Sequence, residues 1–175
     1  MKKTGGFLSK QRALKKFFVS IAVVFALTAV FSLSAGIWAG ENNVSARKLS
    51  VTWVIDGDTI EVAKSGRGKE RIRYAGIDTP EMEEPFYKEA RLRNKELLDK
   101  AGLVTFEVCR DEPFDKYGRT LGWVYADGVD VSEALLKEGL ARIFAKPPCG
   151  KKKYASYKAA EKTAKEQRLG MWGAR

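Results

Sequence analysis

Apolar and polar residues alternate along several short segments of the chain, and this pattern predicts β-strands. Residues 49–62 alternate on both sides of Asp56 and Gly57, and an Asp-Gly pair between two such runs is typical of a β-hairpin. A second turn at residues 66–68 precedes a third alternating segment, residues 71–74. Its two arginines would face one side of the sheet and its two apolar residues the other.

The apolar residues take a helical spacing between residues 85 and 100. The predicted apolar face consists of Tyr87, Ala90, Leu97 and Ala101. Gly102 is placed to end this helix. Residues 104–108 and 121–125 return to a period of two and predict two more strands around a loop at residues 111–119.

Two further helices are predicted near the end of the chain. Ser132 is a favoured N-cap for a short helix that runs to Glu138 and ends at Gly139. The last helix covers residues 154–168, with Tyr157, Ala160 and Ala164 on one face. The five strands lie too close together for helical crossovers throughout. We therefore expect an α+β domain that is mainly a small, closed or partly open five-stranded β-barrel with three helices.

The first forty residues form a segment of a different kind. Basic residues precede an uncharged run, residues 17–40, which is typical of a targeting sequence. The run exceeds the ~7 to 15 residues of a usual signal-peptide apolar region and could cross a bilayer of about 30 Å. Small residues near its end suit a signal peptidase, so cleavage and retention as an anchor both stay open. In either case everything after Glu41 would be exported.

This segment divides the chain into residues 1–40 (signal peptide or membrane signal anchor), residues 41–50 (polar linker) and residues 51–175 (folded domain). Six of the 32 Lys and Arg residues lie in the leader, and without them the formal net charge falls from +10 to +4. Much of the remaining basic charge lies in residues 146–168, which favours an anionic partner. We expect an extracellular or periplasmic protein, tethered to the membrane if residues 17–40 are retained.

Cys109 and Cys149 are the two cysteines, and the chain contains no histidine. In an oxidising compartment a disulfide is the default, with a pair of free buried thiols as the alternative. Two cysteines without histidine cannot supply an ordinary four-ligand zinc site. Imidazole acid-base catalysis and His-activated nucleophiles are also excluded. Any chemistry must therefore use carboxylates, Arg, Lys, Tyr, hydroxyls and a hard metal ion.

Four polar clusters could carry such chemistry, although each has an ordinary structural explanation. Residues 56–59 contain a hairpin turn, but the turn does not explain the second aspartate. Residues 78–81 have the composition of an N-capped helix start. Arg73 alone would be a solvated strand residue, and residues 115–119 a polar loop that turns at a glycine.

Together the clusters contain the residue types that a metal-dependent phosphodiesterase needs. Three carboxylates could offer hard oxygen ligands to Ca²⁺, namely those of Asp56, Asp58 and Asp78. Glu81 remains as a general base for water. Arg73 and Arg119 could clamp a phosphate through paired N–H donors and stabilise the charge of the transition state.

At these residues the chain resembles the staphylococcal nuclease family, from about Val51 to Trp172. The matching blocks are 54–59, Arg73 with 77–81, 115–119, 125–128, and 133–136 with 139–141. The resemblance implies a five-stranded OB-fold barrel with three helices. It also implies a monomeric, calcium-dependent endonuclease that cuts DNA and RNA with little sequence specificity and leaves 3′-phosphate products.

The resemblance also implies roles for individual residues. Asp58 and Asp78 would be carboxylate ligands of Ca²⁺, with the backbone oxygen of Thr79 and with Asp56 nearby. Glu81 would lie beside the attacking water, and Arg73 and Arg119 would bind the scissile phosphate. Lys116 and Tyr117 would hold the terminal phosphate of the nucleotide. Cys109 and Cys149 would lie in loops that the family fold brings together, which favours a disulfide.

Two segments depart from the family pattern. The paired tyrosines after residues 139–141 are missing, which leaves Phe144 as the nearby aromatic residue for substrate binding. The loop after Glu81 is short and acidic and would repel incoming nucleic acid. An OB-fold nucleic-acid-binding module without catalysis is one alternative, but it would be expected to have lost part of the catalytic set. A membrane-tethered structural protein that binds anionic lipid is another, and it leaves the carboxylates without a role.

Overall fold

The structure is a computed structural model that describes residues 46–66, 68–146 and 148–173. These residues belong to one structural unit, Val44–Arg175. The predicted leader, residues 1–40, and the first part of the predicted linker lie outside the described residues. Within the described ranges, no helix is both long enough and apolar enough to cross a membrane.

The first three strands form the predicted antiparallel arrangement. β2 (Val51–Val54), β3 (Thr59–Lys64) and β4 (Gly68–Tyr74) follow one another, and β3 pairs with both neighbours. Ile60 lies opposite Ile72 in the β3–β4 register, and both side chains are fully buried. The alternation of apolar and polar residues therefore predicts correctly which side chains lie on the inner face of the sheet.

Two longer strands and a short one extend the sheet. β6 (Val104–Val108) pairs antiparallel with β7 (Thr120–Ala126), which runs parallel to β4. β8 (Val129–Asp130) pairs with the end of β7. The strand order is β1-β6-β7-β4-β3-β2, and the fold is the predicted α+β OB-fold barrel with three α-helices.

The strand that closes the barrel lies in the segment predicted to be a linker. Arg47–Lys48 form β1 and pair with β6. Leu49 is buried, and its N–H donates to the carbonyl of Val104 at 2.9 Å. Because β2 follows directly and pairs with β3, one continuous segment joins the two ends of the sheet. The linker is therefore shorter than residues 41–50.

A second sheet of two very short strands was not predicted. β5 (Ile77–Asp78) pairs antiparallel with β9 (Arg142–Ile143). Strands of this length show no readable alternation in the sequence. Their pairing places Asp78 beside the segment that leads towards Cys149, and this helps to form the site described below.

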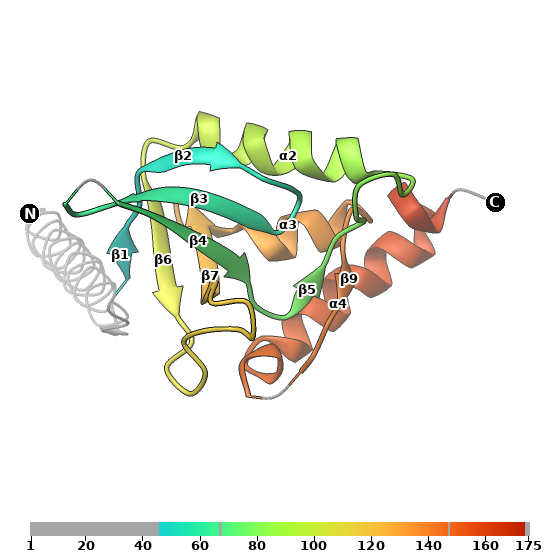
Figure 1. The fold of residues 1–175 in the computed structure, drawn as a ribbon. Helices are drawn as coiled ribbons and strands as arrows, with labels where there is room; N and C mark the ends of the chain where they lie inside the picture. Colours follow the sequence, from blue (N-terminus) through green and yellow to red (C-terminus); the bar gives the residue numbers. More distant parts are fainter. Residues whose placement is uncertain (1–45, 67, 147, 174–175) are drawn as a thin grey trace, which may run out of the picture. The chain divides into compact units, whose positions relative to one another are not determined.

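Three α-helices pack around the barrel, namely α2 (Tyr87–Lys100), α3 (Val131–Lys137) and α4 (Tyr154–Glu166). Two 3₁₀ turns, η1 (Cys149–Lys151) and η2 (Gly170–Trp172), lie on either side of α4. α3 contacts β7 and both other α-helices, and α2 also contacts β2. Figure 1 shows α2 running along β2, and α4 lying beside β9 at the other end of the molecule.

The first helix differs from its prediction at its start and on its buried face. α2 begins at Tyr87, after Phe86 in a left-handed conformation with φ of 69°. Its buried residues are Ala90, Asn94 and Leu98. The predicted Leu97 and Ala101 are half-buried and pack against the core, whereas Asn94 and Leu98 were not predicted. A polar residue on that face and two adjacent leucines made the face ambiguous in the sequence.

The N-cap of the second helix lies two residues before the predicted one. Asp130 is the N-cap of α3, and its side chain accepts hydrogen bonds from the N–H groups of Ser132 and Glu133. Ser132 lies in the first turn and is buried. The predicted end at Glu138 and Gly139 is confirmed, with Gly139 at φ of 70°. For α4 the predicted face is also confirmed, because Tyr157, Ala160 and Ala164 are its buried residues.

Cys109 and Cys149 form a disulfide that joins the end of β6 to η1, with Cα atoms 5.9 Å apart. Both residues are buried, and the described residues contain no free cysteine. The default prediction is confirmed and the alternative of free thiols is wrong. The bridge spans 40 positions of the sequence and so constrains a long loop of the unfolded chain.

Replacing both cysteines with serine is expected to lower the free energy of unfolding by about 4 kcal/mol, the chain-entropy value for a loop of this length. Urea unfolding of the oxidised protein, its reduced form and the double variant would measure the difference. The reduced form is the matched control, because it loses the cross-link and keeps both sulfur atoms. Two titratable thiols in the unreduced, denatured protein would contradict the bridge.

Candidate active site

Asp58 is a buried carboxylate in the loop between β2 and β3. Its Oδ2 accepts hydrogen bonds from the backbone N–H of Thr79 at 2.9 Å and from the Thr79 hydroxyl at 3.1 Å. A Cβ at Gly57 would lie 2.7 Å from Thr79 Cγ2, so glycine lets the two loops approach this closely. Thr79 therefore contacts Asp58 and does not cap a helix, which corrects the structural interpretation of residues 78–81.

Arg73 joins the carboxylates of Asp58 and Asp78. Its Nε lies 3.1 Å from Asp58 Oδ1, and its Nη2 donates to Asp78 Oδ1, also at 3.1 Å. Its Nη1 donates to the carbonyls of Tyr74 (2.7 Å) and Ile77 (2.9 Å). Only 11% of the Arg73 side chain is exposed. These carboxylates and carbonyls together hold the Arg73 guanidinium in place, and its predicted contact with a phosphate stays a prediction.

Asp56 organises the loop that carries Asp58. Its Oδ1 accepts a hydrogen bond from the N–H of Asp58 at 2.9 Å, and its carbonyl accepts one from Asn94 Nδ2 at 3.1 Å. Asn94 is fully buried in α2, and its Oδ1 accepts a hydrogen bond from the hydroxyl of Tyr74 at 2.9 Å. Sequence reasoning missed Asn94. The available signal was a polar residue one turn after Ala90, on the same helical face.

Arg119 lies in the loop between β6 and β7, where Asp115 holds it. Asp115 Oδ1 accepts hydrogen bonds from the N–H groups of Tyr117 (2.9 Å) and Arg119 (3.0 Å). Asp115 Oδ2 accepts one from Arg119 Nε at 2.7 Å, and Arg119 Nη1 lies 3.4 Å from Thr59 Oγ1. Gly118 turns the loop at φ of 77°. Within the described residues, these contacts leave both Nη2 hydrogens of Arg119 for a ligand.

One cavity of about 430 Å³ brings most of the predicted site residues together. It is lined by Asp56, Asp58, Arg73, Asp78, Glu81, Lys116, Tyr117, Arg119 and Phe144, as well as by Cys149. Thr79 lies buried behind Asp58. Glu81 is exposed, and its backbone N–H donates to Glu84 Oε2 at 3.0 Å. The catalytic and binding roles of these residues remain predictions.

Burial sets the electrostatics of Asp58. Desolvation raises the pKa of this carboxyl to about 6, although the Arg73 guanidinium acts in the opposite direction. Asp56 also raises the pKa, and hydrogen bonds from Thr79 lower it. One guanidinium therefore does not fully offset the burial of this negative charge. A further cation beside Asp58 would stabilise its ionised form.

The donor groups around Asp58 fit the chemistry of Ca²⁺, which takes six to eight oxygen ligands and accepts water among them. Asp58, Asp78 and the carbonyl of Thr79 are all hard oxygen donors, and 39% of the Asp78 side chain is exposed. Across the described residues, however, no three acidic or cysteine side chains gather into a group that could hold a metal ion. The ligand roles of Asp56, Asp58 and Asp78 therefore stay predictions, and Asp56 also supports the loop that carries Asp58.

Comparisons with known proteins show that the chain is similar to nucleases. The family model described as "Staphylococcal nuclease homologue" matches residues 71–174. The chain is 37% identical to "Endonuclease YncB" of Bacillus subtilis (strain 168) over 144 residues, which cover 79% of this chain and 67% of that protein. It is 34% identical to "Thermonuclease" of Staphylococcus intermedius over 160 residues, or 88% of this chain and 93% of that protein.

A third relative is considerably longer than the matched region. The chain is 40% identical to "SPbeta prophage-derived endonuclease YokF" of Bacillus subtilis (strain 168) over 124 residues. The match covers 67% of this chain but only 41% of that protein.

Proposed function

The chain belongs to the staphylococcal nuclease family, and on that basis we propose that it is a calcium-dependent endonuclease. It would hydrolyse phosphodiester bonds of DNA and RNA with little sequence specificity and leave 3′-phosphate products. The observation that carries the proposal is one cavity in which Asp58 and Asp78, both held by Arg73, face Glu81 and Arg119.

The two arginines have different parts in the proposed reaction. Arg119 has free Nη2 hydrogens in the cavity and can bind two oxygens of the scissile phosphate, which gains charge in the transition state. Arg73 is paired with Asp58 and Asp78, so it would position these carboxylates as well as contact the phosphate. Ca²⁺ bound by the carboxylates and by the carbonyl of Thr79 would supply positive charge next to the phosphate.

The remaining cavity residues bind the nucleotide and the water. Glu81 is the exposed carboxylate of the cavity and can accept a proton from the attacking water. Lys116 and Tyr117 can bind the next phosphate, since the Lys116 ammonium lies 4.8 Å from the Tyr117 ring at the cavity mouth. Phe144 is exposed in the cavity and offers an apolar face to a base.

We further propose that the enzyme is exported and acts as a monomer. The buried disulfide supports an oxidising compartment. The apolar run at residues 17–40 supports export, and its retention would tether the domain to a membrane. Either location would bring the cavity into contact with nucleic acid outside the cytoplasm.

The ends of the products test the proposed reaction. Digestion of single-stranded DNA, duplex DNA and RNA should give fragments with 5′-hydroxyl groups, which polynucleotide kinase labels without prior phosphatase treatment. The 3′ ends should block extension by a polymerase until a phosphatase removes the phosphate. Products with 5′-phosphates would contradict the proposed bond cleavage. Binding of all three substrates without cleavage would favour a nucleic-acid-binding module instead.

A further inference from the structure

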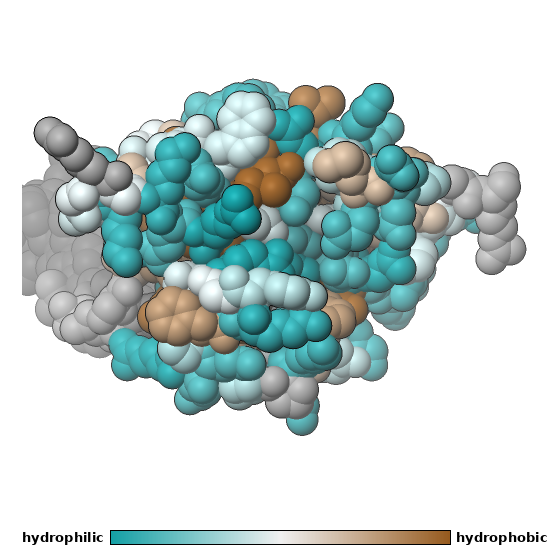
Figure 2. All heavy atoms as spheres, in the orientation of Figure 1, coloured by the Kyte–Doolittle hydropathy of each residue, from teal (hydrophilic) through white to brown (hydrophobic). Residues whose placement is uncertain are grey.

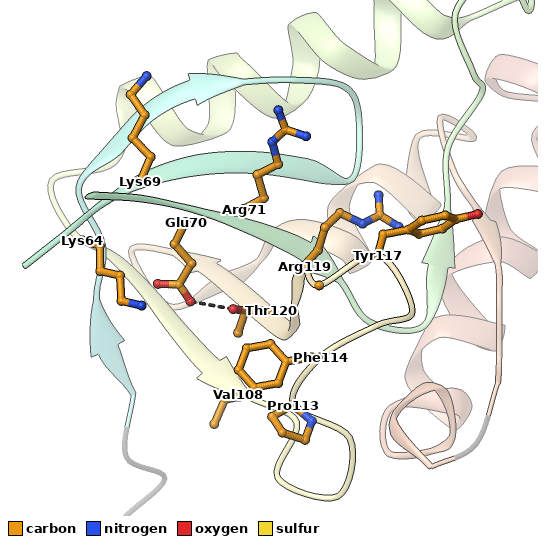
Figure 3. Close-up of a pocket in the computed structure, with 11 residues that line it drawn as sticks. Lys64, Lys69, Glu70, Arg71, Val108, Pro113, Phe114, Tyr117, Arg119 and Thr120 are labelled. Carbon is orange, nitrogen blue, oxygen red and sulfur yellow. Dashed lines mark hydrogen bonds between the residues drawn. The ribbon is translucent and has the colours of Figure 1, made fainter. Parts of the chain in front are cut away.

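A second cavity of about 720 Å³ adjoins the candidate active site. Tyr117 and Arg119 line both cavities, so the two share a wall and open onto the same loop. The second cavity, named here the flanking groove, lies between β4 and the start of the loop after β6 (Figure 3). Its other lining residues include Lys64, Lys69, Arg71 and Phe114. The resemblance to the nuclease family assigned no role to these four residues.

The flanking groove has more basic than acidic side chains in its lining, although Lys69 is itself paired with Glu61 at 2.6 Å. Lys64, Lys69 and Arg71 are exposed basic residues that line it together with Arg119. Glu70 is the acidic residue of its lining, and this carboxylate is already bonded to Arg47 at 2.9 Å and to the Thr120 hydroxyl at 2.6 Å. The groove therefore suits a polyanion.

The basic groups follow the strand at regular intervals. Lys69, Arg71 and Arg73 are alternate residues of β4, so their side chains leave the same face of the strand, roughly 7 Å apart. This interval is similar to that between successive phosphates of an extended single strand. Figure 3 shows Lys69, Arg71 and Arg119 in a row along one side of the groove. The row leads from the outer end of β4 towards the candidate active site.

An exposed aromatic side chain lies across the groove from this row. Phe114 is 60% exposed, although it is a large apolar residue. Its backbone is held by a bridge to Thr120, and the neighbouring carbonyl of Pro113 accepts a hydrogen bond from the N–H of Leu121 at 2.9 Å. Figure 2 shows a mostly hydrophilic face with few apolar patches. A fixed, exposed ring opposite a row of cations matches a site that stacks a base and binds its phosphates.

We propose that the flanking groove binds single-stranded nucleic acid next to the nucleotide that is cut, with a base on Phe114 and phosphates on Arg71 and Lys69. This proposal rests on the proposed nuclease function and extends it with a subsite outside the catalytic cavity. The groove would bind the part of the strand that extends beyond Tyr117 and Arg119. Substrate length, rather than base sequence, would then determine affinity.

The test compares a dinucleotide with a single strand of about twelve nucleotides, a length within the ~4 to 16 nucleotides that an OB fold covers. The full-length, oxidised chain is used throughout, with Phe114→Ala and the double variant Lys69→Gln/Arg71→Gln. Tyr154→Ala and Lys158→Gln/Lys162→Gln are the controls, because they remove an exposed ring and two charges from α4. Affinity is measured by fluorescence anisotropy with a chelator present, and cleavage is measured with Ca²⁺.

Phe114→Ala is expected to weaken binding of the longer strand about tenfold, the effect of losing one stacked base. The double variant should lower the slope of log affinity against log salt by about 1.4, or about 0.7 for each phosphate contact. Neither variant should change kcat/KM for the dinucleotide. Tyr154→Ala should match the wild type, and Lys158→Gln/Lys162→Gln should weaken binding of the longer strand less than Lys69→Gln/Arg71→Gln. Unchanged binding of the longer strand, or an equal loss of kcat/KM on both substrates, would overturn the proposed role of the groove. Groove-dependent binding without any cleavage would instead overturn the nuclease function.

Discussion

Replacing Arg119 with glycine is expected to lower kcat/KM for nucleic-acid cleavage by roughly 10³- to 10⁵-fold, the range for arginines that stabilise the charge of a transferring phosphoryl group. The Arg119 guanidinium is fixed at Nε by Asp115 and presents its Nη2 group to the cavity. Its side chain is only 27% exposed and is bonded to Asp115, so the fold of the variant has to be checked together with its activity. Steady-state cleavage of one oligonucleotide at saturating Ca²⁺ would measure the change, and circular dichroism would show that the barrel remains folded.

Two further variants test the forked donor of Arg119 and the proposed general base Glu81 separately. Arg119→Lys keeps the positive charge and loses the forked donor, so it should recover little of the lost rate. Glu81→Gln is isosteric and should lower kcat by roughly 10²- to 10⁴-fold, as expected for loss of a general base. Wild-type rates in either Arg119→Gly or Glu81→Gln, with the fold intact, would rule out the assigned mechanism.

The sequence predicted the barrel well because its signals are local. Alternation over residues 49–74 requires only that one face of each strand be buried, and Ile60, Val62 and Ile72 are fully buried as expected. The disulfide was also predictable, since only two cysteines were available. The motif residues gather in one cavity because most of them follow strand ends, where the loops of a small barrel converge.

The errors arose where one residue type can serve either a local or a distant partner. Thr79 has the composition of an N-cap, but its hydroxyl and N–H are bonded to Asp58, which lies 21 positions earlier. Arg73 taken alone would be a solvated strand residue, but two carbonyls and two carboxylates contact its guanidinium and only 11% of the side chain is exposed. These contacts join chain segments that meet only in the folded state, so the spacing of residues in the sequence does not predict them.

Chelation of Ca²⁺ is expected to lower the cleavage rate by roughly 10³-fold or more, and excess Ca²⁺ should restore it. Asp58 and Asp78 face the cavity and are paired directly with Arg73, and without a bound cation beside them their charge would disfavour a nearby phosphate. The measurement is the initial rate as a function of free Ca²⁺, buffered with a chelator. A rate that is indifferent to the chelator would contradict calcium dependence.

A stability measurement tests the same ion without relying on activity. Because Ca²⁺ would bind only the folded chain, a hundredfold excess over its Kd should stabilise the wild type by about 2.7 kcal/mol. Asp58→Asn is the matched variant, since it removes the charge and keeps an oxygen that can accept the N–H of Thr79. This variant should unfold at the same temperature with and without Ca²⁺. An equal calcium-induced rise in the unfolding temperature of both proteins would mean that the ion binds away from Asp58. The burial of the Asp58 carboxylate beside Arg73 would then need another explanation.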